Sequence, residues 1–148
     1  MKSVVFFPVK PHVFKFLKFK YGDSVTYSSG LSLSPVIRTA ISDAEICSVS
    51  PFSTNLHYPV ELSSFYLNKF DVVYSKKKAY QFNADVDTMF REELYQFMNM
   101  NHDIYGVQYN TSFRDFLKRL EITEDDIKHE TLLKQFRRHY RKKEDKAA

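Results

Sequence analysis

The chain is poor in the residues on which several classes of protein depend. Among its 148 residues are one cysteine, Cys47, three glycines, five prolines and no tryptophan. A single cysteine excludes an internal disulfide framework, and no cluster of cysteine and histidine has the spacing of a zinc site. Three isolated glycines cannot form the phosphate loop G-x-x-x-x-G-K-[ST] or the dinucleotide motif G-x-G-x-x-G. We therefore expect no bound metal and no cofactor.

Long hydrophobic runs are also missing from the sequence. The first residues, MKSVVFFPVKP, contain a short apolar stretch that Pro8 interrupts and Lys10 follows. This stretch is too short and too broken for a secretory signal or a membrane-spanning helix, and no other stretch approaches the roughly 18 apolar residues that a span needs. We expect no membrane partner and a cytoplasmic location, where reducing conditions suit a lone cysteine.

No arrangement of titratable residues predicts an enzyme. There is no H-E-x-x-H motif, and the histidines at 101–103 and 129–130 stand directly beside acids. Adjacent residues on a helix do not face one another, so neither pair is a catalytic dyad. Asp71, Asp85 and Asp87 could form a magnesium site for nuclease chemistry, but helix capping explains Asp85 and Asp87 better. We expect no catalytic residue.

The sequence is rich in apolar and aromatic residues. Hydrophobic residues make up 43% of the chain and aromatic residues 16%, as 14 Phe and 10 Tyr. A chain of this length and composition can bury the core of one ordinary domain. Core filling is the preferred interpretation of the aromatic residues, and platforms for stacking nucleic-acid bases are the alternative.

Charge is distributed unevenly along the chain, although the net charge is only +4. Residues 1–22 carry five Lys and no acid, and residues 132–148 carry seven Lys or Arg and two acids, so each end has a net charge of +5. The span between them carries ten Lys or Arg and sixteen Asp or Glu, a net charge of −6. If the two ends meet in space, they form one basic face that favours a polyanionic partner.

The first 22 residues predict a strand followed by a helix. The β-branched and aromatic residues at 4–9 are typical of a strand. Residues 10–22 fit a helix with Pro11 in its first turn and Gly22 at its end, and they also fit a strand, since part of the segment alternates with period two. We prefer the helix, whose apolar face would comprise Val13, Phe14, Leu17 and Tyr21.

The second half of the chain has a clearer helical pattern. Asn83 or Asp85 is expected to cap a helix that runs to about Met100. Ser112 is expected to cap the next helix, and Thr123 with the acids after it to open the last one. The apolar stripes of the three helices would be Val86, Phe90, Leu94, Phe97 and Met98; Phe113, Phe116, Leu117 and Leu120; and Ile127, Leu132, Leu133, Phe136 and Tyr140.

The predicted fold class is α+β, with a small N-terminal strand and helix part and a predominantly helical C-terminal half that ends like a helix-turn-helix. We expect a single domain over 1–148, with an α+β part at 1–82, a helical part at 83–143 and a flexible tail at 144–148. Three further segments are predicted within the first part: a helix at 35–46, an irregular loop at 47–59, and a strand or hairpin at 60–74.

The most basic stretch, KQFRRHYRKK at 134–143, is the leading candidate for a binding site. In a helix, Phe136 and Tyr140 would anchor one side in the core, while the cations would face the phosphates or the major groove of nucleic acid. The predicted nucleic-acid-binding residues are Lys134, Arg137, Arg138, Arg141, Lys142 and Lys143, with Lys15, Lys18 and Lys20 as secondary contacts.

These features predict a small intracellular nucleic-acid-binding protein, with duplex DNA favoured, that regulates or assists transcription or replication without catalysis. Small size, no enzyme motif and a basic terminal helix resemble the small regulators of phages and mobile elements. A protein–protein adaptor or inhibitor that docks a partner through the basic helix or the acidic middle is the alternative, and a solvated helix end would also explain the cations. Two-fold symmetry suits a DNA binder, so a homodimer stays open, although no heptad seam supports one.

Overall fold

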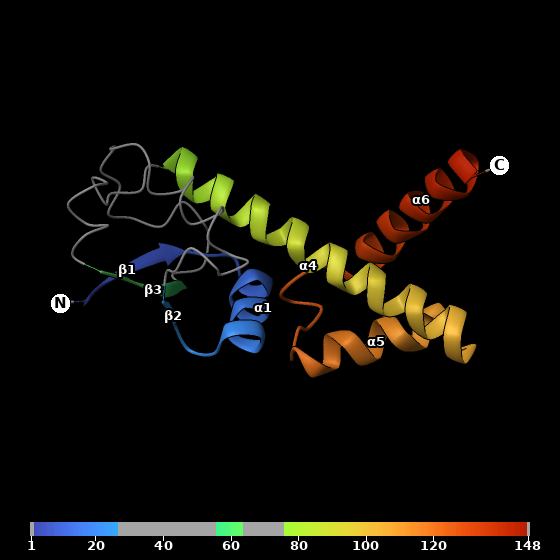
Figure 1. Cartoon of the computed structure of the whole chain (residues 1–148), viewed down its shortest axis with the longest axis horizontal. Coiled ribbons are helices and arrows are strands. Elements are labelled where there is room, and N and C mark those ends of the chain that lie inside the picture. The colour runs from blue at the N-terminus through green and yellow to red at the C-terminus, as the bar shows by residue number, and fades with distance from the viewer. Residues whose placement is uncertain (1, 27–55, 64–75, 148) are drawn as a thin grey trace. The chain divides into compact units, whose positions relative to one another are not determined.

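In a computed structural model, which describes residues 2–26, 56–63 and 76–147, a small sheet precedes a helical half (Figure 1). The elements in chain order are β1 (Lys2–Pro8), α1 (Pro11–Tyr21), β2 (Val25–Thr26), β3 (His57–Ser63), α4 (Lys76–Tyr105), α5 (Tyr109–Arg119) and α6 (His129–Ala147). The predicted α+β class with a helical C-terminal half is confirmed. The helix predicted at 35–46 lies outside the described residues.

The chain divides into two compact units, Met1–Phe90 and Arg91–Ala148. Helix α4 is continuous across this boundary and contributes its first half to one unit and its second half to the other (Figure 1). The single domain expected from the sequence stays a prediction. None of the helices in the described ranges combines the length and the hydrophobicity that crossing a membrane requires.

The sheet of the first unit has the strand order β1-β3-β2. Strand β1 runs antiparallel to β3, with Phe7 opposite Tyr58, and β2 runs parallel to β3. Val4 and Phe6 are 44% and 54% exposed and Phe7 is buried, as on a strand with one buried face, and Pro8 and Val9 after it are buried as well. The strand predicted at 4–9 is confirmed except for Val9, which follows β1. The loop predicted at 47–59 is wrong for residues 57–59, because these residues pair with β1.

Helix α1 confirms the helical interpretation of residues 10–22. Pro11 occupies the first turn, and Gly22 ends the helix with a φ of 91°, a conformation that side chains other than glycine rarely adopt. The predicted apolar face is wrong in part, because the buried residues are His12, Val13, Phe16 and Leu17. Phe16 is buried because its ring packs edge-on against Phe90, at 5.7 Å between centroids.

Tyr58 ties strand β3 to the end of helix α1. Its side chain is fully buried, and its hydroxyl donates a hydrogen bond of 2.9 Å to the carbonyl of Gly22, with the Leu17 carbonyl at 3.4 Å. Burial raises the pKa of Tyr58 to about 12, and the negative charges that Tyr21 and Asp23 can carry add to the shift. Tyr58 is therefore protonated in the folded protein at neutral pH.

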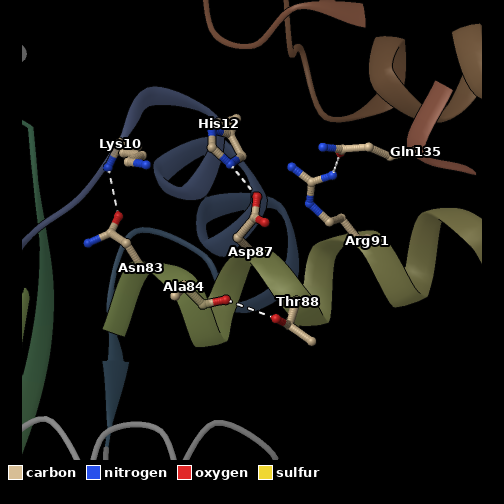
Figure 2. A network of polar contacts seen from close by, with 8 residues as sticks. All are labelled: Lys10, His12, Asn83, Ala84, Asp87, Thr88, Arg91 and Gln135. Atoms are coloured by element: carbon tan, nitrogen blue, oxygen red, sulfur yellow. Dashed lines mark hydrogen bonds and ion pairs between the residues drawn. The ribbon is translucent and has the colours of Figure 1, made fainter. Parts of the chain in front are cut away.

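The first half of α4 packs against β1 and α1. Phe82 stacks on Phe7 at 4.6 Å and 13° between the rings, and Val86 and Phe90 are fully buried. Asn83 accepts a hydrogen bond from the Lys10 N–H through Oδ1 and donates one to the Pro8 carbonyl through Nδ2, both at 2.9 Å; the first of these bonds appears in Figure 2. Asn83 thereby joins the end of β1 and the start of α1 to α4.

The predicted caps Asn83 and Asp85 are wrong, because α4 already begins at Lys76. Residues 76–82, KKKAYQF, include several good helix formers and make up the first turns of α4. Asn83 therefore lies inside the helix with its own backbone already in the helical ladder, and its side chain bonds to residues distant in sequence. Asp85 accepts a bond of 2.8 Å from Gln81 on an exposed side of the helix.

The second unit has its own core, made by the second half of α4 with α5 and α6. Leu94 and Met98 of α4 are fully buried, and Phe97 contacts Phe116 of α5 at 5.4 Å between ring centroids. Gly106, with a φ of 66°, ends α4. The further buried residues of this core are Phe113, Leu117, Leu120, Ile122, Leu132 and Phe136.

The two ends of the apolar stripe predicted along α4 have different partners. Phe97 contacts Phe116 of α5, but Phe90 contacts Phe16 and His12 of α1. The sequence shows the stripe along α4, but it does not show that two different cores share it.

The starts of α5 and α6 also differ from the prediction. Helix α5 begins at Tyr109 with Gln108 at its N-cap, so the predicted cap Ser112 lies inside the helix and is buried. Thr123 and Asp126 form a turn, closed by a 2.9 Å bond from the Thr123 N–H to the Asp126 carboxylate, and α6 begins at His129. The carboxylate of Glu124 accepts the His129 N–H at 3.2 Å, so one of the predicted acids does serve the N-terminus of α6.

We predict that Phe90→Ala will destabilise the protein by about 3–5 kcal/mol, because it removes a fully buried ring from the core of the first unit. Unfolding in urea, followed by far-UV circular dichroism, measures this change. Phe19→Ala removes the same side chain from a position that is 57% exposed and should change stability by less than about 0.5 kcal/mol. Equal effects of the two substitutions would contradict the assigned core.

The raised pKa of Tyr58 predicts a loss of stability at alkaline pH. Its phenol titrates near 10 in the unfolded chain and at about 12 in the folded one, so unfolding is favoured progressively as the pH rises through this window. Below pH 10 the stabilisation is fully present. Urea unfolding at several pH values should show that Tyr58→Phe lacks this component of the decline, whereas Tyr80→Phe, at a 45% exposed position, retains it. A Tyr58→Phe profile parallel to that of the unsubstituted protein would refute the assignment.

Candidate nucleic-acid interface

Helix α6 separates its apolar and basic side chains onto different sides. Leu132 and Phe136 are buried, while Lys134, Arg137 and Arg138 are exposed. This arrangement follows from the helical period, which places residues 132 and 136 on one face. Of the remaining predicted contact residues, Arg141, Lys142 and Lys143 belong to α6, and their side chains lie outside the described residues.

Aromatic and polar contacts anchor this helix to the rest of the second unit. The ring of Phe136 contacts Tyr95 of α4 and Tyr109 of α5, at 5.3 Å and 5.2 Å between centroids. Arg91 of α4 donates a hydrogen bond to the side chain of Gln135 (Figure 2). The predicted anchoring by Phe136 is confirmed, whereas the side chain of Tyr140 lies outside the described residues.

Among the described side chains of α6, Lys134 forms an ion pair and two arginines do not. Lys134 pairs with Glu130 at 3.2 Å, but both side chains are more than half exposed, and such pairs contribute little to stability. Arg137 and Arg138 form no ion pair with the described part of the chain. The two guanidinium groups are therefore available to an external anion.

A pocket of about 220 Å³ lies directly beside these cations. Two aromatic side chains, one aliphatic side chain and three polar ones line it: Tyr109, Phe136, Leu133, Gln108, Asn110 and Arg137. The pocket thus combines an apolar wall with a guanidinium group and two side-chain amides.

The rings of the pocket belong to a longer series of aromatic contacts, which we call the aromatic row. His102 stacks on Tyr109 at 4.2 Å, Tyr109 contacts Phe136, Phe136 contacts Tyr95, and Tyr95 contacts His139 at 5.2 Å. The row links α4, α5 and α6, with an exposed histidine at each end. Sequence reasoning missed it because its members come from three helices and share no local spacing.

The lysines of α1 form a separate basic surface in the first unit. Lys18 and Lys20 are exposed and Lys15 is half-buried. The Lys18 ammonium lies 3.9 Å from an Asp23 carboxylate, and the Lys20 ammonium lies 5.8 Å from the centre of the Phe16 ring, within the range of a cation–π contact. That the two basic ends of the chain, residues 1–22 and 132–148, form one face stays a prediction.

A close pair of titratable groups joins α1 to α4. His12 Nε2 lies 2.7 Å from Asp87 Oδ1, and the His12 side chain is only 7% exposed (Figure 2). Asp87 therefore fastens α1 to α4, and its predicted role as a helix cap is wrong. The described ranges contain no group of three or more His, Cys, Asp or Glu residues that could hold a metal ion. Asp71 lies outside those ranges.

Comparison with known proteins returned no match to any protein-family model, curated protein or solved structure.

We predict that the purified protein will neither cut nucleic acid nor hydrolyse nucleotides when magnesium or manganese is added. Asp87 bonds to His12 and Asp85 to Gln81, and in the described part of the chain neither belongs to a group of three or more residues that could hold a metal ion. Gel assays of cleavage and release of inorganic phosphate provide the measurements. Metal-dependent turnover that disappears in both Asp85→Ala and Asp87→Asn would overturn this expectation.

Proposed function

We propose that this protein binds nucleic acid, preferentially duplex DNA, through the exposed cations of α6, and that it acts without catalysis. It would serve as a regulator or an accessory factor of transcription or replication in the cytoplasm. The observation that carries the proposal is the position of Arg137 and Arg138, which are exposed and available on a helix whose opposite side is fixed in the core.

A fixed helix is an efficient support for phosphate contacts. Nucleic acid presents one negative charge per phosphate, and each phosphate that a cation neutralises releases a condensed counterion, which favours binding. Arginine can bond to a phosphate through two N–H groups at once, and its planar group loses less freedom on binding than a lysine side chain does. The burial of Phe136 means that the helix bearing Arg137 is already ordered before binding.

The connection between α5 and α6 favours contact with the phosphate backbone over reading of bases in the major groove. In DNA-binding helix-turn-helix units, a turn of roughly three to four residues joins the two helices. Here the connection runs from Leu120 to Lys128 and contains its own turn at Thr123–Asp126. Phosphate contacts position a protein on nucleic acid but carry no sequence information, so we propose binding with low sequence specificity.

One observation favours the alternative function, docking of a protein partner. Three large apolar side chains are exposed near the end of α4: Met100, Ile104 and Tyr105, at 50%, 65% and 73%. Met100 and Ile104 are four residues apart and so lie on one face of the helix. Clusters of exposed apolar residues often mark interaction sites. An adaptor would use this face with, or instead of, the basic helix.

We predict that Arg137→Ala combined with Arg138→Ala will weaken binding to duplex DNA and flatten its dependence on salt. Each phosphate contact contributes about −0.9 to the slope of log K against log salt, so losing two contacts should reduce the slope by about two. Stability should change by less than about 1 kcal/mol, because exposed charges contribute little to folding. Fluorescence anisotropy over a salt series gives both the affinity and the slope.

A matched control for this double substitution is Arg114→Ala combined with Lys118→Ala. It removes two exposed cations from α5 in the same unit and leaves α6 intact, so it separates loss of net charge from loss of the contact surface. The control should keep most of the affinity. If the α6 variant binds with the affinity and the salt slope of the unsubstituted protein, α6 is not the contact surface and the adaptor becomes the leading candidate.

A further inference from the structure

The pocket beside Arg137 has the dimensions and lining of a site for one planar ring. We propose that it receives a single unpaired base of a nucleic acid whose flanking phosphate meets Arg137. This inference rests on the proposed function and adds a preference for nucleic acid in which a base is free to leave the stack, such as a bulge or a strand end.

The volume of the pocket limits what can occupy it. Sites for drug-sized ligands usually measure about 300–1,000 Å³, whereas this pocket measures about 220 Å³. A complete nucleotide, with its sugar and phosphate, would need more room than the pocket offers. A single ring system fits, provided that its sugar and phosphate stay outside, where Arg137 is exposed.

The apolar wall of the pocket is suited to stacking and is already ordered. Tyr109 is held by the ring of His102 at 4.2 Å, and Phe136 by the ring of Tyr95 at 5.3 Å. A base that enters therefore meets a wall whose orientation is fixed, so little conformational entropy is lost on binding. Phe136 is only 2% exposed, so the half-buried Tyr109 is the ring that can stack on a base, and stacking on an aromatic ring tolerates any base.

The polar side of the pocket is suited to the edge of a base and to its phosphate. Gln108 and Asn110 bring amide groups, which can both donate and accept hydrogen bonds. No carboxylate lines the pocket, and the first turn of α5, which includes Tyr109 and Asn110, contains no acid. The partial positive charge at the start of α5 and the guanidinium of Arg137 therefore act together on an anion at the rim.

The side chain of Gln108 is available for this role. Gln108 occupies the N-cap of α5, yet its side chain makes no capping hydrogen bond. A residue chosen to stabilise this helix would more commonly be Ser, Thr, Asp or Asn. Replacing Gln108 should therefore leave the helix intact while removing one amide from the pocket.

Fully paired DNA cannot fill the pocket, because its bases are stacked inside the helix. Extruding a paired base costs a few kcal/mol, and this cost is smallest for a base that has no partner. A base can therefore enter the pocket only from a bulge, an unpaired end or a single strand. The phosphate contacts of α6 are the same for paired and unpaired nucleic acid. The pocket should therefore raise the affinity for nucleic acid with an unpaired base, while paired DNA still binds through α6.

The test compares three DNA duplexes of equal length: fully paired, with one bulged adenine, and with one bulged abasic site. The two bulged duplexes have the same backbone, so their difference reports the contact with the base alone. Stacking of one base is worth enough to make the adenine bulge bind roughly five- to 150-fold more tightly than the abasic bulge. In Leu133→Trp, which fills the pocket, this difference should disappear while binding of the paired duplex and its salt slope persist.

Two further variants keep the result interpretable. Asn110→Trp covers the pocket from an exposed position and replaces Leu133→Trp if that variant fails to fold. Gln108→Ala should reduce the preference without affecting the paired duplex. Equal binding of the adenine and abasic bulges by the unsubstituted protein would overturn the inference and leave the proposed function standing. Absence of salt-dependent binding to all three duplexes would overturn both.

Discussion

The fold depends on one continuous apolar stripe along α4. Every fourth residue from Phe82 to Met98 is buried: Phe82, Val86, Phe90, Leu94 and Met98. The first three belong to the core of one unit and the last two to the core of the other. Neither unit has a complete core without its half of this helix, so the stability of each depends on the same element.

The core of the second unit also determines what the surface of that unit can do. Exposed arginines on a freely moving helix would lose conformational entropy on binding an anion, and this loss offsets much of a weak electrostatic gain. Here the aromatic row fixes α6 against α4 and α5 before any partner arrives. The aromatic residues, which are the most unusual feature of the composition, fill the core of the second unit, and two rings of the row, Tyr109 and Phe136, also line the pocket.

The sequence predicted those features that depend on local spacing. The strand of β1, the limits of α1 at Pro11 and Gly22, and the burial of Phe136 beside exposed Arg137 and Arg138 all follow from alternation, helical period or backbone preference. The double role of α4 could not be predicted, because spacing shows that a face is apolar but not which segment covers it.

Contacts between distant residues explain the remaining errors. Asn83 resembles a helix cap in sequence, yet its partners, Lys10 and Pro8, are 73 and 75 residues away. His12 and Asp87 are also 75 residues apart, and their side chains lie within hydrogen-bond distance. The pocket likewise unites residues of 108–110 with residues of 133–137. Such sites exist only once the chain has folded, so no local sequence pattern predicts them.

Acidic residues precede basic ones in the first half of α6. Glu124 and Glu130 stand at its start, and Lys134, Arg137 and Arg138 follow. Glu130 and Arg138 are separated by roughly 12 Å at 1.5 Å per residue, which exceeds the Debye length of about 8 Å in physiological salt. The charges of Glu130 and Arg138 are therefore largely screened from one another. In the complex that we propose, a phosphate at Arg138 would not be repelled by Glu130, which is also paired with Lys134.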